Sequence, residues 1–130
     1  MTTFAEAFTA NDADALSSLL AEDVRFSSPA SHRQYVGRST VLPMLLAARR
    51  ALEDFRYVDE LSAPNRHVLE FVALVGDRQL QGVDLVSFAD DGRVTELTVM
   101  IRPLSGLQAV AEAVGRSLSA GPPAAIVDGH

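Results

Sequence analysis

The stretch LQGVDLVSF at residues 80–88 decides the fold, because it has the composition of a strand but carries an acid in its middle. Its β-branched, aliphatic and aromatic residues are typical of a half-buried strand. Asp84 stands at the centre, where a carboxyl group needs either a partner or an unusual environment. The residues around this stretch therefore decide whether the acid is structural or functional.

Other segments with a period of two accompany this strand, at residues 55–61, 67–75 and 94–102. Turn sequences separate the four segments: Ala-Pro-Asn at 63–65, Gly-Asp at 76–77 and Asp-Asp-Gly at 90–92. Such turns connect neighbouring antiparallel strands. The second half of the chain therefore predicts an antiparallel meander, in which residues 78–88 form the third strand.

Helical signals dominate the first part of the chain. Thr3 and Glu6 have the spacing of a capping box, and residues 11–14 form a second helix start. A short strand follows at residues 24–26. The Ser, Pro and Gly content of residues 27–37 predicts a loop.

Two further helices flank the meander. Ser39 or Thr40 can cap the first of them, which places Pro43 in its first turn, where a missing amide costs little. Ser105 opens a capping box that starts the second helix. The residues from 119 to 130 read as a tail with two prolines.

Helices followed by paired strands predict one α+β domain, at residues 1–118, with the C-terminal tail at 119–130. We expect a curled antiparallel sheet to wrap around the N-terminal helices and leave a cone with one open end. The face of the sheet opposite Asp84 is also apolar. Its residues are Val68, Val72, Leu74, Val83, Leu85, Val94 and Met100. Because few helices remain to cover this face, we predict a homodimer through the outer face of the sheet.

The composition narrows the class of partner. A formal charge of −6 and a pI near 4.9 argue against nucleic acid or an anionic membrane surface as a partner. The chain has no cysteine, no apolar run long enough to span a bilayer and no positively charged leader before its first apolar residues. We expect a soluble, cytoplasmic protein.

Three stretches carry a family resemblance: F-x(3)-F-x-A-N-D-x-D-A-L-x(2)-L-L-A-E-D-V-R-F-x-S-P at residues 4–29, Y-V-G-R at 35–38 and G-V-D-L-V-S-F-A-D-D-G-R-V-T-E-L at 82–97. Over residues 4–105 the chain resembles the SnoaL-like branch of the nuclear-transport-factor-2-like (NTF2-like) superfamily. This superfamily includes ketosteroid isomerases, polyketide cyclases and limonene epoxide hydrolases. The resemblance implies a conical barrel with a pocket between the concave sheet and the helices.

The resemblance also gives Asp84 a role. It matches the acid of ketosteroid isomerases that an apolar site keeps neutral, so that it can donate a hydrogen bond to a developing oxyanion. Ser28 stands where those enzymes carry the general-base aspartate, and Phe4 where they carry a tyrosine, so steroid isomerisation by that route is not expected. The alternatives for Asp84 are a salt bridge to Arg102 or a water-facing bulge beside Gly82.

We take Asp84 as the first catalytic candidate, and His32 and Tyr35 as candidates in the loop near the pocket mouth. The predicted ligand-binding residues line the cone. They are Phe4, Phe8, Phe26, Ser28, Leu69, Phe71, Gly82, Val86, Leu97, Val99 and Ile101. The acids Glu53, Asp54, Asp59 and Glu60 read as the solvated side of a strand.

Two functions remain open. The first is binding of a small, mainly apolar molecule, with or without a carbonyl group, and its isomerisation, cyclisation or hydration assisted by Asp84. The second is a binding or accessory domain, or a dimeric interaction module, without turnover. The histidines have no metal-ligand spacing, so the sequence predicts no metal site and no cofactor.

Overall fold

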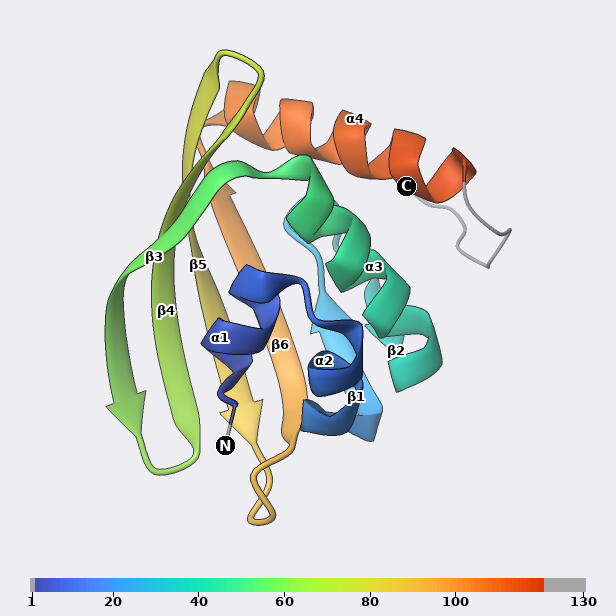
Figure 1. The fold of residues 1–130 in the computed structure, drawn as a ribbon, viewed down its shortest axis with the longest axis vertical. Helices are drawn as coiled ribbons and strands as arrows, with labels where there is room; N and C mark the ends of the chain where they lie inside the picture. The colour runs from blue at the N-terminus through green and yellow to red at the C-terminus, as the bar shows by residue number, and fades with distance from the viewer. Residues whose placement is uncertain (1, 121–130) are drawn as a thin grey trace.

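A computed structural model describes residues 2–120 as one curved, six-stranded sheet with four helices (Figure 1). The strands are β1 (Leu20–Ser27), β2 (Gln34–Val36), β3 (Glu53–Ala63), β4 (Arg66–Val75), β5 (Arg78–Phe88) and β6 (Val94–Arg102). The helices are α1 (Phe4–Ala10), α2 (Ala13–Leu19), α3 (Arg38–Ala51) and α4 (Leu104–Ala120). Figure 1 shows α1, α2 and α3 on one side of the sheet, with α4 across one end of it. The predicted α+β cone is confirmed.

The sheet has the strand order β2-β1-β6-β5-β4-β3. The predicted meander is correct, since β3, β4, β5 and β6 pair in sequence and antiparallel. The prediction of a wholly antiparallel sheet is wrong, because β1 pairs with β6 in parallel. Within residues 2–120 the edge strands β2 and β3 are not paired to each other, so the sheet remains open.

Strand β2 lies inside the segment predicted as a loop. Its three residues pair antiparallel with β1, with Tyr35 opposite Phe26. The sequence did not predict this edge strand, because Ser, Pro and Gly residues surround it and the strand is too short to show a period of two. The loop proper is therefore shorter than predicted.

The observed helix starts agree with the predicted starts for α1 and α2 and differ from them for α3 and α4. Thr3 and Glu6 form the predicted capping box, and Asp12 caps α2 through the amide of Ala15. Neither Ser39 nor Thr40 caps α3. That helix begins directly after Gly37, so that Pro43 lies inside it rather than in its first turn.

Helix α4 also starts earlier than predicted. It begins at Leu104, directly after Pro103, whose carbonyl accepts a hydrogen bond from the amide of Leu107 at 3.0 Å. Ser105 is therefore already helical rather than a cap. The helix continues to Ala120, which overlaps the first residues of the predicted tail, and the rest of that tail lies outside the described residues.

The core fills the concave side of the sheet with aromatic rings. The ring of Phe55 lies 5.3 Å from that of Phe8, 4.9 Å from that of Tyr57 and 5.4 Å from that of Phe71. Phe4 stacks on Phe8 one turn away on α1. Buried aromatic side chains are large contributors to core stability. The interior of the cone is therefore packed around its aromatic residues rather than hollow throughout.

The outer face of the sheet is partly apolar, as predicted. Met100 is 52% exposed, and Val58 and Leu61 on the edge strand are exposed as well. Val94 was predicted on this face but is fully buried in the core. The reason is an irregularity in the pairing near Ser87, which turns Val94 inward.

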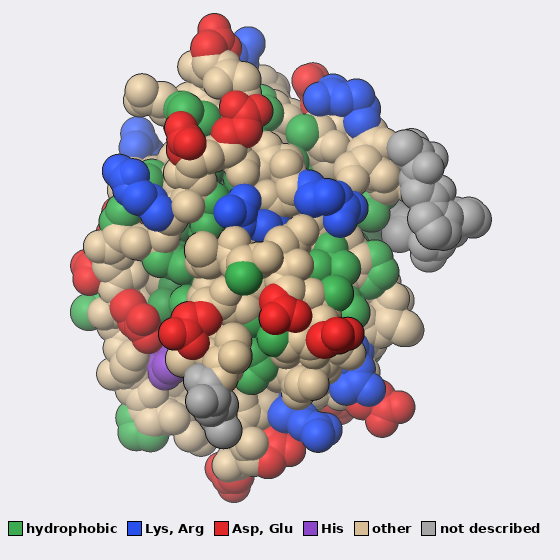
Figure 2. All heavy atoms as spheres, in the orientation of Figure 1, with side chains coloured by type: hydrophobic (Ala, Val, Ile, Leu, Met, Phe, Trp, Pro, Cys, Tyr) green, Lys and Arg blue, Asp and Glu red, His purple; other side chains and the backbone are tan. Residues whose placement is uncertain are grey.

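The side of the molecule that carries α1 and α2 shows both signs of charge. Figure 2 shows acidic and basic side chains interspersed over this face. None of the helices in residues 2–120 is long and apolar enough to cross a membrane.

Candidate functional site

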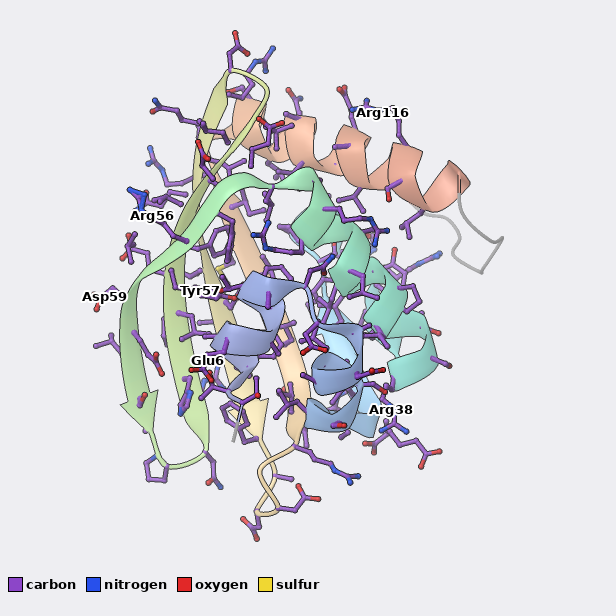
Figure 3. All side chains as sticks on the ribbon, in the orientation of Figure 1. Glu6, Arg38, Arg56, Tyr57, Asp59 and Arg116 are labelled. Atoms are coloured by element: carbon purple, nitrogen blue, oxygen red, sulfur yellow. The ribbon has the colours of Figure 1, made fainter. Side chains whose placement is uncertain are left out.

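Asp84 and Tyr57 form a buried polar pair inside the cone. The hydroxyl of Tyr57 donates a hydrogen bond of 2.7 Å to Oδ2 of Asp84. Asp84 comes from β5 and is 5% exposed, and Tyr57 comes from β3, two positions away in the sheet. Figure 3 shows Tyr57 pointing toward α1 on the inner side, whereas Arg56 and Asp59 point away from the sheet. The acid in LQGVDLVSF is therefore held by a phenol from another strand.

This pairing excludes both structural alternatives for Asp84. Arg102 is exposed and donates to Oε1 of Gln81 at 3.1 Å rather than to Asp84. The pairing of β5 with β4 runs without a register shift through Gly82 and Asp84, so no bulge turns the acid toward water. Asp84 faces the interior as a regular strand residue.

Burial changes the protonation of both groups. Desolvation raises the pKa of Asp84 to about 7, and the hydrogen bond from Tyr57 opposes this rise because it stabilises the carboxylate. Desolvation also raises the pKa of Tyr57, and the nearby charge of Asp84 raises it further. The phenol therefore stays protonated and acts as a donor, while Asp84 exchanges its proton near neutral pH.

Gly82 makes room for the ring that covers this pair. A Cβ atom at residue 82 would lie 2.4 Å from Cζ of Phe71 and 2.6 Å from the carbonyl oxygen of Met100. Phe71 is the cross-strand partner of Gly82 and also contacts the ring of Tyr57. The glycine two residues before the acid thus lets an aromatic ring lie flat beside it.

A pocket of about 200 Å³ opens at one end of the cone. The amino-terminal end of α1 forms one of its walls, and β3, β4 and the turn after β5 form the others. Its lining residues are Thr2, Thr3, Phe4, Ala5, Leu19, Glu60, His67, Leu69, Phe88 and Gly92. The pocket is mostly apolar, with a carboxylate and an imidazole among its walls.

Asp84 does not itself line this pocket, but its nearest neighbour on β4 does. Leu69 is the direct cross-strand partner of Asp84 and belongs to the pocket wall. Side chains of direct cross-strand partners on one face lie about 5 Å apart. A molecule in the pocket therefore lies one strand position from the buried acid.

The predicted loop residues lie in and next to β2, the edge strand of the sheet opposite β3. His32 is exposed, and Tyr35 is half-buried on the edge strand β2, with its ring 6.5 Å from that of Phe26. Strand β2 is three positions away from β5 in the sheet. Neither residue lines the described pocket, so a catalytic role for His32 or Tyr35 stays a prediction.

The hydroxyl group of Ser28 takes part in a local turn. Its Oγ accepts a hydrogen bond of 3.1 Å from the amide of Ala30. Of the other predicted ligand-binding residues, Phe4 and Leu69 line the pocket. Gly82 is buried beside Phe71 and does not line the pocket. The rest belong to the surrounding core or pack against it: Phe8, Phe26, Phe71, Val86, Leu97, Val99 and Ile101.

Two residues of the site were not assigned a role from the sequence. Tyr57 alternates with Phe55, so a shared inward face was the signal that could have identified it. Glu60 was predicted to be solvated, but it lines the pocket. The register shifts between Tyr57 and Asp59, which turns Glu60 to the inner face.

The described acidic and imidazole side chains do not gather into a metal site. Within residues 2–120 no group of three or more His, Cys, Asp or Glu side chains could hold a metal ion.

An open cone of this shape, with an acid on its wall, defines an NTF2-like α+β protein. The SnoaL-like domain model matches residues 1–97, and the chain belongs to this SnoaL-like family. A steroid delta-isomerase from Pseudomonas aeruginosa is similar at 40% identity, over 88% of this chain and 85% of that chain, with a TM-score of 0.84.

Other solved structures share the fold. An uncharacterised bacterial protein with a cystatin-like fold from Silicibacter pomeroyi is 29% identical over 88% of this chain and 82% of that chain, with a TM-score of 0.85. A putative ketosteroid isomerase from Kribbella flavida is 21% identical over 78% of this chain and 73% of that chain, with a TM-score of 0.66. A comparison with curated proteins found no match.

Proposed function

We propose that this protein binds a small, mainly apolar molecule that carries a carbonyl group, and that this group enters past Leu69, so that Asp84 donates a hydrogen bond to the carbonyl oxygen. The observation that supports this most directly is the buried pair of Tyr57 and Asp84, one strand position from the pocket wall at Leu69. An apolar pocket with a few convergent polar groups is the usual design of a ligand site.

The protonation of Asp84 suits this role. Since its pKa is about 7, roughly half of the carboxyl groups carry a proton at pH 7. Tyr57 engages Oδ2, so the second carboxyl oxygen can carry the proton that a ligand carbonyl accepts. A neutral acid of this kind stabilises negative charge that develops on the oxygen during isomerisation, cyclisation or hydration.

Steroid isomerisation by the route of the ketosteroid isomerases is not part of the proposal. One similar structure is called a steroid delta-isomerase. This chain, however, has Phe4 and Ser28 at the positions that the resemblance gives to the catalytic tyrosine and base. Ser28 already makes a turn, and a serine hydroxyl without a base beside it does not remove a proton from carbon near pH 7.

The size of the pocket also limits the ligand. At about 200 Å³ it is smaller than the roughly 300–1,000 Å³ of sites for drug-sized molecules. A single-ring molecule fits this volume better than a four-ring steroid. A non-catalytic binding domain is the second candidate, favoured by the position of Asp84 behind Leu69 rather than in the pocket wall.

The test compares two molecules of the same shape, cyclohexanone and methylenecyclohexane, by NMR titration of the labelled protein. We expect tighter binding of the ketone at pH 6, and a smaller preference at pH 8, where the carboxylate has no proton to donate. The Asp84→Asn variant keeps a donor and should keep the preference at both pH values, whereas Asp84→Leu should lose it. Equal affinity of the wild type for the two molecules would refute the proposal.

A second assay tests whether the protein catalyses steroid isomerisation. A 5-ene 3-ketosteroid is incubated with the protein, and the conjugated 4-ene product is followed by ultraviolet absorbance. We expect no conversion above the buffer rate. Conversion well above it would show that the base is supplied by a residue other than the one at position 28.

A further inference from the structure

Glu60 and His67 face each other across neighbouring strands at the pocket. Nδ1 of His67 lies 3.6 Å from Oε2 of Glu60, and both residues line the pocket wall. The side chain of His67 is 33% exposed and that of Glu60 is 50% exposed, so both lie between the pocket and the solvent. The register shift after Tyr57 brings Glu60 to this face, next to Leu69.

One carboxylate oxygen of Glu60 makes both of the contacts to Ser62 and His67, and the other oxygen makes neither of them. The hydroxyl of Ser62 donates to Oε2 of Glu60 at 3.3 Å, so both contacts of the carboxylate use the same oxygen. In a neutral imidazole whose Nδ1 carries the proton toward the carboxylate, the opposite nitrogen, Nε2, is an acceptor. The ring of Phe88, 4.7 Å away, packs on the edge of the imidazole. The pair therefore offers two acceptors, Nε2 of His67 and Oε1 of Glu60.

We propose that Glu60 and His67 form a second polar site at the mouth of the pocket, which binds a hydroxyl group of the ligand. A hydroxyl donates to an acceptor of this kind, whereas an ether or ketone oxygen has no proton to give. The walls beside the pair are hydrocarbon, from Phe4, Leu19 and Leu69. A neutral hydroxyl enters such surroundings at lower desolvation cost than an ammonium group does.

The position of His67 also sets the length of the ligand. Leu69 pairs directly with Asp84, and His67 lies two residues earlier on the same face of β4. Diagonal neighbours of this kind are about 7–8 Å apart. Where the proposed carbonyl site at Asp84 holds, the ligand class is a single-ring ketone with a hydroxyl at the opposite end.

The experiment isolates the hydroxyl from the carbonyl. Cyclohexanol and methoxycyclohexane have the same ring, but the ether lacks the donor, and neither has a carbonyl. Binding is measured by NMR titration of the wild type, with the amides of Leu69 and Phe88 as local reporters. We expect cyclohexanol to bind between roughly twofold and tenfold more tightly, which is the net effect of one hydrogen bond that replaces a bond to water.

Variants assign the preference to the pair. Glu60→Leu and His67→Phe should each reduce it, and the double variant should abolish it. Glu70→Leu is the matched control, because Glu70 lies on the same strand as His67 but hydrogen-bonds Gln81 on the other side of the sheet. It should leave the preference unchanged.

Several outcomes overturn the inference. They are equal affinity of the wild type for alcohol and ether, a preference that survives in the double variant, and tighter binding of cyclohexylammonium than of cyclohexanol. The wild-type comparison requires no variant to fold. A failed carbonyl test at Asp84 with a retained hydroxyl preference would remove the proposed function and leave this site standing.

Discussion

The Tyr57 hydroxyl lies 2.7 Å from Oδ2 of Asp84, although the two residues come from strands that do not pair with each other. The curvature of the sheet brings the phenol over the carboxyl group, and Phe71, on the strand between β3 and β5, packs against the ring of Tyr57. Asp84 is consequently shielded from water, and its Oδ2 accepts a hydrogen bond from the hydroxyl of Tyr57. Its pKa and its chemistry both depend on this arrangement.

Stability should depend on pH through Asp84. The pKa of this group is about 7 in the folded chain and near 3.8 without the fold, so the unfolded chain releases this proton first. The contribution of Asp84 to folding is therefore fully present below about pH 4 and is lost as the pH rises through 7. The loss is on the order of 4 kcal/mol.

Urea unfolding at a series of pH values checks this. In the Asp84→Asn variant the fall in unfolding free energy between about pH 4 and 7 should be largely absent. A wild-type curve that rises over this range would contradict the raised pKa.

Removal of the phenol should raise the pKa of Asp84 further. The hydrogen bond from Tyr57 stabilises the carboxylate, so Tyr57→Phe removes the influence that lowers this pKa while the ring remains in place. Carbon-13 NMR titration of the carboxyl group measures the change. Tyr35→Phe is the control, since Tyr35 packs near Phe26, and it should leave the titration of Asp84 unaltered.

Gly82→Ala should destabilise the fold by roughly 1–3 kcal/mol, because the added methyl meets the ring of Phe71 and a backbone oxygen. Gly115→Ala in α4 provides the matched control. Its Cβ would meet nothing within 4 Å, and alanine favours a helix over glycine by up to about 1 kcal/mol. Thermal unfolding of the two variants should therefore shift in opposite directions. A neutral effect at residue 82 would mean that Phe71 can move aside.

The outer face of the sheet should mediate a homodimer. Val58, Leu61 and Met100 are exposed large apolar side chains on the described part of the sheet. Apolar surface of this kind on a small domain is commonly buried by a second copy. Light scattering at micromolar concentration should give the mass of a dimer, and Met100→Glu should shift it toward the monomer. A monomeric wild type would end the prediction.

Part of the candidate site was readable from the sequence. Asp84 stands out in an apolar strand, and the period of two correctly put Gly82 and Val86 on its face. The acid's partner was not readable, because a contact between β3 and β5 spans a strand and depends on curvature. Glu60 is exposed, as predicted, but the face on which it lies was not readable for a related reason, since one extra residue in a strand reverses the face of all that follow.

The sequence by itself determined the order of the four helices and of five of the six strands, the bounds of β5 and β6, and an acid in the middle of an apolar strand. These features depend on local spacing of apolar residues and turn residues, which act over a few positions. Only the tertiary structure decided that Tyr57 holds Asp84, that rings fill most of the cone, and that Glu60 and His67 meet at a small pocket. Those contacts join distant segments, so they exist only once the sheet has curved and its register is set.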